Sequence, residues 1–476
     1  MSKREKFEVP IEEIQKQKEI IQRIRQRNDM MFQHSGRQKL AMITTYGCQQ
    51  NENDSEKIRG MLYEMGYGFT EDKEEADLIL YNTCCVRENA EFRVFGNIGA
   101  LKHLKKRKPE LLIGVCGCMM QQEHIVQQIK QKYTHVDMIF GTHTLYRFPE
   151  ILEKSMNEAY TVVDILNTDG YIVEDMPIQR EGKVKAWVSI MYGCNNFCSY
   201  CIVPYVRGRE RSREPEQILR EVEQLAAEGY KEITLLGQNV NSYGKDLDEP
   251  IDFADLLRKV NDIKGIHRIR FTTSHPKDIS DKLIQTMSEC EKVCEQLHLP
   301  FQAGSNKVLK KMNRRYTKEK YLEIVAKIKK AIPGIALTSD VIVGFPGETN
   351  EDFEETLDLV KKVEFDSLFT FIYSPRKGTP AEKMPDVLTT EEKQANFQKL
   401  LDVQNEISRK INEGYLGKTV EVLVEGYSKT NPEMLTGRTR TGKIVHFKGN
   451  ENMTGNLINV KINQVQTWSL FGQIEE

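Results

Sequence analysis

Two series of short apolar runs alternate with helical stretches, and this alternation limits the fold more than any other feature of the chain. The first series begins at Leu40 and contains the runs LAMITTYG, ADLILYN, LLIGVCG and VDMIFGT. The second begins at Lys185 and contains KAWVSIMYG, EITLLGQN, HRIRFTTSH, EQLHLPFQ, ALTSDVIVGF and SLFTFIYSP. Strands that alternate with helices build βαβ units and parallel sheets. We therefore predict two α/β domains.

The chain has 476 residues, too many for one hydrophobic core, because cores stop growing at roughly 250–300 residues. The first series predicts a domain at residues 38–155, after which TVVDIL and a polar segment form a passage to the next domain. The second series predicts a partial, TIM-like (β/α)6 barrel at residues 180–413, which ends in a long helix. Residues 414–476 alternate like strands without a helix and predict a small β-barrel. The predicted fold class is α/β multidomain.

Residues 1–37 lie outside both series and have the pattern of an amphipathic helix. Their isoleucines are spaced for one helical face, and we interpret the segment as a solvated or loosely docked extension. These isoleucines are Ile11, Ile14, Ile20, Ile21 and Ile24.

The composition indicates a cytoplasmic protein without a membrane partner. The first thirty residues lack the apolar core of a signal peptide, and no apolar run reaches the ~18–20 residues of a membrane span. Ten cysteines is a low density for this length. In a reducing cytosol, grouped cysteines more often bind metal or do redox chemistry than form disulfides. The net charge is -2, so any RNA-binding surface must be local.

Three cysteines in the segment YGCNNFCSYCIVPY form a C-x3-C-x2-C motif: Cys194, Cys198 and Cys201. They follow the first strand of the second series, and ligands of βα domains bind at the carboxyl ends of strands. A structural zinc site would need four ligands. Thiolates also suit iron-sulfur clusters, and three of them leave one iron of a 4Fe-4S cluster open. The open position predicts a small-molecule ligand.

Three earlier cysteines, Cys48, Cys84 and Cys118, each follow a strand of the first series. Successive parallel strands deliver their carboxyl ends to one edge of a sheet, where three thiols can meet. Their spacing does not by itself exclude chance, and Cys85 or Cys116 could substitute for a neighbour. We interpret the trio as a second three-thiolate site.

The motifs TYGCQQN, NTC-x-VRENA and GC, in this order ahead of C-x3-C-x2-C, resemble the methylthiotransferase family of the radical S-adenosylmethionine superfamily. The resemblance covers about residues 38–476. It implies a flavodoxin-like amino-terminal domain with an auxiliary 4Fe-4S cluster on Cys48, Cys84 and Cys118, a radical S-adenosylmethionine barrel, and a carboxyl-terminal TRAM RNA-binding domain. Cys85 and Cys116 are then buried extras, and Cys290 and Cys294 receive no role.

The resemblance implies an enzyme that replaces C–H by C–S–CH3. Two 4Fe-4S clusters would take part, and S-adenosylmethionine would serve both as methyl donor and as source of a 5′-deoxyadenosyl radical. No side chain beyond the cluster ligands is nominated as catalytic. A reductant protein of flavodoxin or ferredoxin type and a sulfur donor are expected partners.

Four segments most resemble the branch of the family that acts on isopentenyl-adenosine beside the tRNA anticodon: LLGQNVNSYG, RFTTSHPKDIS, LPFQAGSNKVLKKMNRRYT and YSPRKGTPAEKM. The alternatives are threonylcarbamoyl-adenosine in tRNA, an aspartate of a ribosomal protein, and a non-enzymatic RNA-binding metalloprotein. Basic clusters support binding of the anticodon stem-loop, because such clusters neutralise phosphates. They lie at residues 102–109, 206–213 and 307–320 and in GRTRTGKIVHFK.

Four polar or aromatic residues are candidates for binding the cofactor. The resemblance places Tyr200 under the adenine and Gln238 at the methionine amine, while Ser274 and Gln302 end the third and fourth strands of the second series. The alternative role for each is that of a polar residue at a strand end that caps the following helix.

Overall fold

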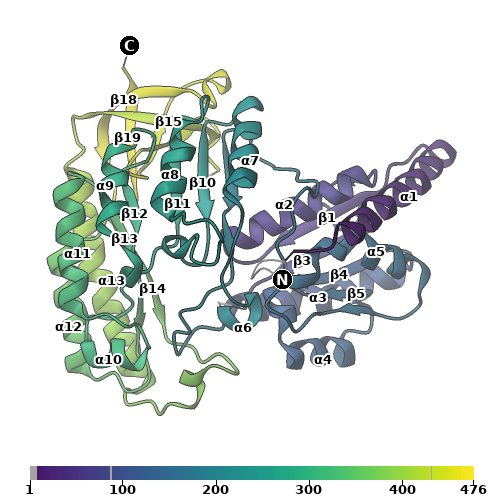
Figure 1. Cartoon of the computed structure of the whole chain (residues 1–476), viewed down its shortest axis with the longest axis horizontal. Helices are drawn as coiled ribbons and strands as arrows, with labels where there is room; N and C mark the ends of the chain where they lie inside the picture. Colours follow the sequence, from purple (N-terminus) through teal and green to yellow (C-terminus); the bar gives the residue numbers. More distant parts are fainter. Residues whose placement is uncertain (1–7, 86–87, 430, 476) are drawn as a thin grey trace.

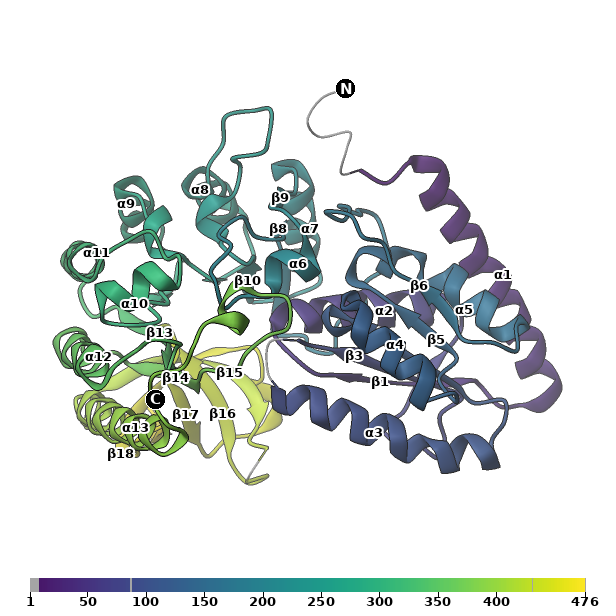
Figure 2. The same cartoon turned by 90° about the horizontal axis from the view of Figure 1, so that it is seen from below.

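The computed structural model describes residues 8–85, 88–429 and 431–475. Two α/β domains lie side by side, and a small β-barrel packs on the second of them (Figures 1 and 2). This arrangement confirms the predicted α/β multidomain class.

A six-stranded parallel sheet forms the amino-terminal domain, in the order β2-β1-β3-β4-β5-β6. One apolar cluster packs on each face of the sheet. The strands are β1 (Leu40–Thr45), β2 (Gly68–Phe69), β3 (Leu78–Thr83), β4 (Leu112–Gly117), β5 (Met138–Phe140) and β6 (Val162–Asp164). The helices are α2 (Gln49–Glu64), α3 (Glu88–Arg107), α4 (Glu123–Lys132) and α5 (Phe148–Asn157), with short 3-10 turns η1 (Cys118–Gln121) and η2 (Thr142–Arg147).

The interpretation of TVVDIL as a mere passage between domains is wrong. Its residues Val162–Asp164 form β6, which pairs with β5 and completes the sheet. A strand of three residues is too short for its alternation to distinguish it from a loop. The still shorter β2 at the other edge also gives no signal in the sequence.

Helix α1 (Ile11–Ser35) is firmly docked, which corrects the expectation of a loose extension. Ile20, Ile21 and Ile24 are buried in the same apolar cluster as residues of α2 and α5. Full burial of such side chains contributes about 1.5–3 kcal/mol each. Arg23 also pairs with Glu153 of α5 at 2.9 Å. Residues 1–7 of the predicted extension lie outside the described part.

Six parallel strands form the second domain as two adjoining three-stranded sheets, β11-β10-β7 and β12-β13-β14. A bridge between Ile269 and Val293 joins the two sheets. The end strands β7 and β14 are not paired with each other in the described structure, so the barrel is partial, as predicted. The strands are β7 (Lys185–Ser189), β10 (Glu232–Leu236), β11 (Arg268–Thr272), β12 (Gln296–His298), β13 (Ala336–Val343) and β14 (Ser367–Ile372). A short antiparallel pair, β8 (Met191–Tyr192) and β9 (Arg211–Ser212), lies beside them.

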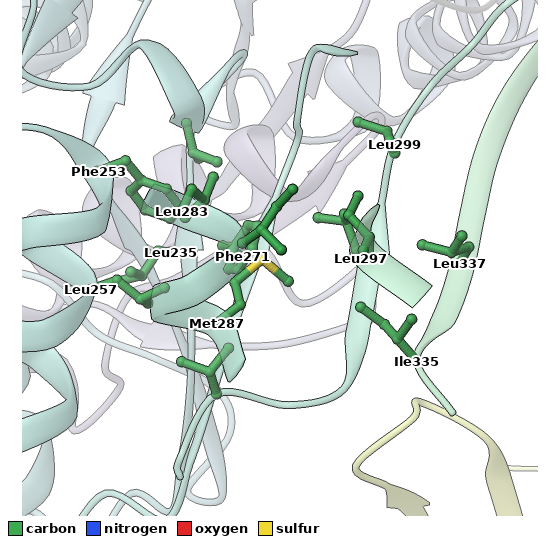
Figure 3. Packing of buried hydrophobic residues seen from close by; sticks show 14 of the residues in the cluster. Leu235, Phe253, Leu257, Phe271, Leu283, Met287, Leu297, Leu299, Ile335 and Leu337 are labelled. Carbon is green, nitrogen blue, oxygen red and sulfur yellow. The ribbon is translucent and has the colours of Figure 1, made fainter. Parts of the chain in front are cut away.

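Helices cover the outside of this partial barrel, and one continuous core fills the space beneath them. Figure 3 shows Leu257, Leu283 and Met287 of the helices packed around Leu235 and Phe271 of the strands, with Leu297 and Leu337 of the other sheet alongside. The helices are α6 (Val203–Arg207), α7 (Pro215–Ala227), α8 (Phe253–Asp262), α9 (Asp281–Glu289), α10 (Asn306–Lys311), α11 (Lys318–Ala331), α12 (Asn350–Val363) and α13 (Thr390–Glu413). Of the helices in the described ranges, none is both long and apolar enough to cross a bilayer.

A closed five-stranded barrel, in the order β15-β16-β17-β19-β18, forms the carboxyl-terminal domain. It has its own apolar core, and it docks on the second domain through buried Arg268, which contacts Glu421 at 2.8 Å. The strands are β15 (Thr419–Tyr427), β16 (Leu435–Thr439), β17 (Ile444–Phe447), β18 (Leu457–Val465) and β19 (Ser469–Ile474). The small barrel expected from strand alternation is therefore present.

Candidate active site at the domain interface

Backbone contacts close the loop that contains Cys194, Cys198 and Cys201. Gly193 before it has φ 73°, and a Cβ there would lie 2.0 Å from the carbonyl oxygen of Arg209. Only glycine fits such a position. The amide of Cys194 donates to the Gly208 carbonyl at 3.1 Å, and that of Cys201 donates to the Cys198 carbonyl at 2.9 Å. The loop therefore returns on itself and brings its cysteines to one side.

Arg314 is a buried side chain that the sequence motif did not identify, and it contacts this loop directly. Its Nη1 donates to Cys198 Sγ at 3.4 Å, and its Nη2 donates to the Pro300 carbonyl at 2.8 Å. Burial raises the pKa of the Cys194 thiol to about 12. A cation beside such thiols favours the thiolate form that binds metal. Arg314 thus supplies a positive charge where the motif places its ligands.

The second trio lies at the carboxyl edge of β1, β3 and β4, where Cys48, Cys84 and Cys118 follow the three strands. Cys48 immediately precedes α2, and Cys118 opens η1. The sulfurs of Cys48 and Cys118 lie 3.4 Å and 4.0 Å from the same atom, Oδ1 of Asn51. A Cβ on Gly47 would lie 2.8 Å from Cβ of Cys84, so this glycine permits the third cysteine to approach.

Arg207, at the end of α6, connects the second trio to the other domain. Its Nε donates to Cys118 Sγ at 3.1 Å, and its Nη2 donates to Asp54 Oδ2 at 2.8 Å. Hydrogen bonding by Cys85, and then the charge of Arg207, lowers the pKa of Cys118 to about 7. Helix α6 follows Cys201 directly and lies between the two domains in Figure 2. Both cysteine trios are therefore joined by one short segment.

The remaining cysteines occupy distinct environments. Cys85 is buried against Cys118, Ile202 and Val206, so it stays a rival of Cys84 as a ligand. Cys116 is buried in β4 within the apolar core, and burial raises the pKa of its thiol. Cys290 and Cys294 are buried in the second domain. Val86 and Arg87 of the NTC-x-VRENA motif lie outside the described residues.

The donor sets fit iron-sulfur clusters with three protein ligands. None of the ten cysteines, all of which are described, forms a disulfide. Within the described ranges, no three Cys, His, Asp or Glu side chains converge tightly enough for a single metal ion. A 4Fe-4S cluster holds its thiolates further apart than one zinc ion does, because irons and sulfides lie between them. The chemistry of the donors suits such a cluster, because each trio offers three thiols and has a buried arginine beside one of its sulfurs; the individual ligands stay predictions.

A cavity of about 740 Å³ adjoins the cysteine loop and is lined by Tyr200, Cys201 and Gln302. Asp340 and Arg376, which the sequence did not single out, also line it. The structure therefore brings two of the four predicted cofactor contacts together beside Cys201.

The other two candidates, Gln238 and Ser274, lie in the loops after β10 and β11 and do not line this cavity. The hydroxyl of Ser274 donates to Asn241 Oδ1 at 3.2 Å, and the following 3-10 turn is capped by His275 instead. His275, the next residue, packs against Tyr316, with ring centroids 5.7 Å apart.

Many residues of the predicted basic clusters are used inside the protein. Arg207, Arg211 and Arg213 are buried, so the expectation that they face solvent phosphates is wrong. Lys105 pairs with Asp137 at 2.9 Å. Arg440 pairs with Glu295 at 2.7 Å, across the contact between the small barrel and the second domain. A run of basic letters does not reveal which side chains are buried by domain docking.

Comparison with known proteins agrees with this site. Residues 188–360 match the Radical SAM superfamily, residues 40–141 match "Uncharacterized protein family UPF0004", and residues 413–474 match the TRAM domain. A solved radical S-adenosylmethionine methyltransferase, TsrM from Kitasatospora setae with cobalamin and a [4Fe-4S] cluster bound, aligns with a TM-score of 0.51 at 14% identity. The alignment covers 72% of this chain and 74% of that one and shows a shared fold.

The fold and the C-x3-C-x2-C site define a radical S-adenosylmethionine enzyme with a methylthiotransferase domain arrangement. A tRNA-2-methylthio-N(6)-dimethylallyladenosine synthase of Acetivibrio thermocellus is 59% identical over 99% of this chain and 98% of its own. One of Alkaliphilus oremlandii is 59% identical over 100% and 99%. The chain belongs to this family of synthases.

Proposed function

We propose that this protein methylthiolates carbon 2 of N6-dimethylallyladenosine in tRNA, at position 37 beside the anticodon. The observation that carries the proposal is the joining of two largely buried cysteine trios by the segment that runs from Cys201 to Arg207. A methylthiolation needs both C–H activation and a sulfur source, and two adjacent sites provide for both. The family of its relatives supports this substrate.

We infer that Cys194, Cys198 and Cys201 hold one 4Fe-4S cluster and that Cys48, Cys84 and Cys118 hold the second. When bound, the clusters and S-adenosylmethionine supply radical C–H activation and the methylthio group. The cavity lined by Tyr200 and Gln302 would receive S-adenosylmethionine, and Gln238 and Ser274 are proposed as further contacts from neighbouring strand ends.

The protein's own residues orient these groups and exclude water from them. Arg314 and Arg207 each donate to one cysteine sulfur from a buried position. Such hydrogen bonds to sulfur, together with burial, tune the potentials of iron-sulfur clusters. Arg314 is held by its hydrogen bond to the Pro300 carbonyl, and Arg207 by its hydrogen bond to Asp54. These contacts fix the position of each arginine relative to its cysteine site.

The tRNA anticodon stem-loop is the proposed partner, and the carboxyl-terminal TRAM barrel supports RNA binding. A flavodoxin- or ferredoxin-type reductant and a sulfur donor complete the proposed partners. The absence of disulfides among the ten cysteines supports a cytoplasmic setting. We propose the functional division 1–37, 38–155, 180–413 and 414–476, with α1 forming part of the amino-terminal unit in space.

The decisive experiment incubates the reconstituted protein, S-adenosylmethionine and a reductant with isopentenylated tRNA, then identifies the modified nucleoside by mass. Threonylcarbamoylated tRNA and the ribosomal protein serve as parallel substrates. Product on isopentenylated tRNA alone supports the proposal, and product on either other substrate alone overturns it. About eight irons per chain are expected for two clusters; fewer than about five would contradict the two-site mechanism.

A further inference from the structure

A second, smaller cavity of about 60 Å³ lies between the two α/β domains. Lys57 and His143 line it from the amino-terminal domain, and Tyr192, Arg207 and Arg211 line it from the second domain. A water molecule needs only about 10–15 Å³ of such space. The cavity is therefore large enough for a ligand of one or a few heavy atoms.

The charges around this cavity do not balance. Lys57, Arg207 and Arg211 contribute positive charge, whereas Asp54 is the one carboxylate among the lining residues. Asp54 is bound by Arg207 at 2.8 Å. Lys57 Nζ donates to the Tyr192 hydroxyl at 2.8 Å. Burial lowers the pKa of His143 to about 4, so its ring is neutral at pH 7 and adds nothing to the net charge of the lining residues.

Arg211 is the group with the least compensation. It is 3% exposed, and no carboxylate of the described residues lies within ion-pair distance of it. Its Nη1 donates to backbone carbonyls, including those of Arg207 at 3.1 Å and Arg209 at 2.8 Å. Its Nε has no hydrogen-bond partner in the described structure. Burial lowers its pKa to about 10, so it is still charged at neutral pH.

A buried, unpaired guanidinium is costly, and proteins normally pair such a charge. A bound anion would satisfy Nε of Arg211 and offset the excess positive charge. The lining also includes Met61, Leu145 and Met176. Apolar neighbours favour a weakly hydrated, polarisable anion over a strongly hydrated one such as phosphate.

We infer that this cavity binds hydrosulfide and holds it beside the auxiliary cysteine site. Arg207 connects the two places, because it lines the cavity and donates to Cys118 Sγ at 3.1 Å. The inference rests on the proposed function, since a methylthiolation consumes one sulfur atom per product. According to this inference, the sulfur source is a small inorganic sulfur anion, and the cavity is where it binds.

The test locates the anion directly. Crystals of the cluster-loaded, full-length protein are soaked separately in hydroselenide, bromide and phosphate, and anomalous or difference density is sought beside Arg211. Hydroselenide stands in for hydrosulfide, and its anomalous signal at the selenium absorption edge can be distinguished from that of iron. Selenium density beside Arg211 supports the inference. Density for bromide or phosphate only, or no density at all, overturns it.

Kinetics with hydrosulfide as the sulfur source provide a second readout. Arg211→Gln should raise the KM for hydrosulfide about tenfold with little change in kcat, because a ground-state contact is lost. Arg220→Gln removes an exposed arginine of α7 and should change neither. An unchanged KM in Arg211→Gln contradicts the inference. If selenium binds but the wild type makes no methylthiolated nucleoside, the proposed function fails while the anion site stands.

Discussion

Nε of Arg207 lies 3.1 Å from Sγ of Cys118, although these two residues belong to different domains. The same guanidinium pairs with Asp54 at 2.8 Å, and both partners are almost completely buried. The contact therefore serves the cysteine site and the domain interface together.

Arg207→Met should weaken the domain interface and the auxiliary site together. It leaves the buried Asp54 carboxylate with no ion-pair partner among the described residues and only a 3.5 Å hydrogen bond from Gln50, and breaking a buried pair in this way costs about 3–5 kcal/mol. We expect a lower thermal midpoint and less iron bound after reconstitution, with the C-x3-C-x2-C site still able to cleave S-adenosylmethionine. Calorimetry and iron analysis check the two parts.

Adding Asp54→Asn to Arg207→Met separates the two effects. The double variant removes the stranded charge and should recover part of the thermal midpoint. It should not recover the iron, because the donor to Cys118 is still missing. Full recovery of iron in the double variant would mean that Arg207 acts on the site through folding alone.

Cys84→Ala should leave cleavage of S-adenosylmethionine intact and stop methylthiolation of tRNA. The reason is that Cys84 belongs to the trio on the sheet edge, whereas cleavage belongs to the trio that contains Cys194. Cys194→Ala should abolish cleavage. Liquid chromatography of 5′-deoxyadenosine and mass analysis of the nucleoside measure the two activities.

Two neighbouring cysteines provide matched controls for this experiment. Cys116→Ala removes a thiol from the apolar core and should reduce stability slightly while sparing both activities. Cys85→Ala removes the thiol beside Cys118. If Cys84→Ala still produces methylthiolated tRNA and Cys85→Ala does not, Cys85 is the ligand and our assignment is wrong.

The strands, and the placement of Cys48, Cys84 and Cys118 after three of them, could be predicted because both depend on local pattern. Apolar runs of at least four residues mark their strands, and parallel topology fixes where each strand ends. The same reasoning missed β6, which has only three residues. Short edge strands carry too little pattern to separate them from loops.

Arg207 and Arg314 could not be identified from sequence because their role arises from tertiary packing. Each lies in a run of basic residues that reads as a solvated, phosphate-binding surface. In the fold, their neighbours Arg209 and Arg315 are exposed while they themselves are buried against cysteine sulfurs. The position of an arginine within the run does not show whether its side chain is buried or exposed. Burial depends on how α6 and the segment after α10 pack in the folded protein.

Glu348→Gln should stabilise the protein increasingly as pH rises from 5 to 8. Glu348 is 1% exposed, and burial raises its pKa to about 7 from the usual 4.5. Between these values the folded protein keeps a proton that the unfolded chain releases, so wild-type stability falls as pH rises. The glutamine stays neutral and should gain about 2 kcal/mol by pH 8 relative to wild type. Thermal midpoints across this pH range measure it. Glu351→Gln, at an exposed position, should show no such trend.

Arg268→Met should release the carboxyl-terminal barrel from the second domain without unfolding it. Arg268 is completely buried and donates to the Arg438 carbonyl at 2.6 Å and to Glu421 at 2.8 Å. Losing these contacts removes charged hydrogen bonds between the two domains, worth about 1.5–3 kcal/mol each, although Glu421, whose side chain is 44% exposed, can then be solvated. The closed barrel keeps its own core. We expect faster proteolysis between α13 and β15 and weaker tRNA binding, with the barrel fragment still folded by circular dichroism. Arg258→Met, at an exposed pair with Glu289, should change neither. Unchanged proteolysis in Arg268→Met would show that other contacts dominate the docking.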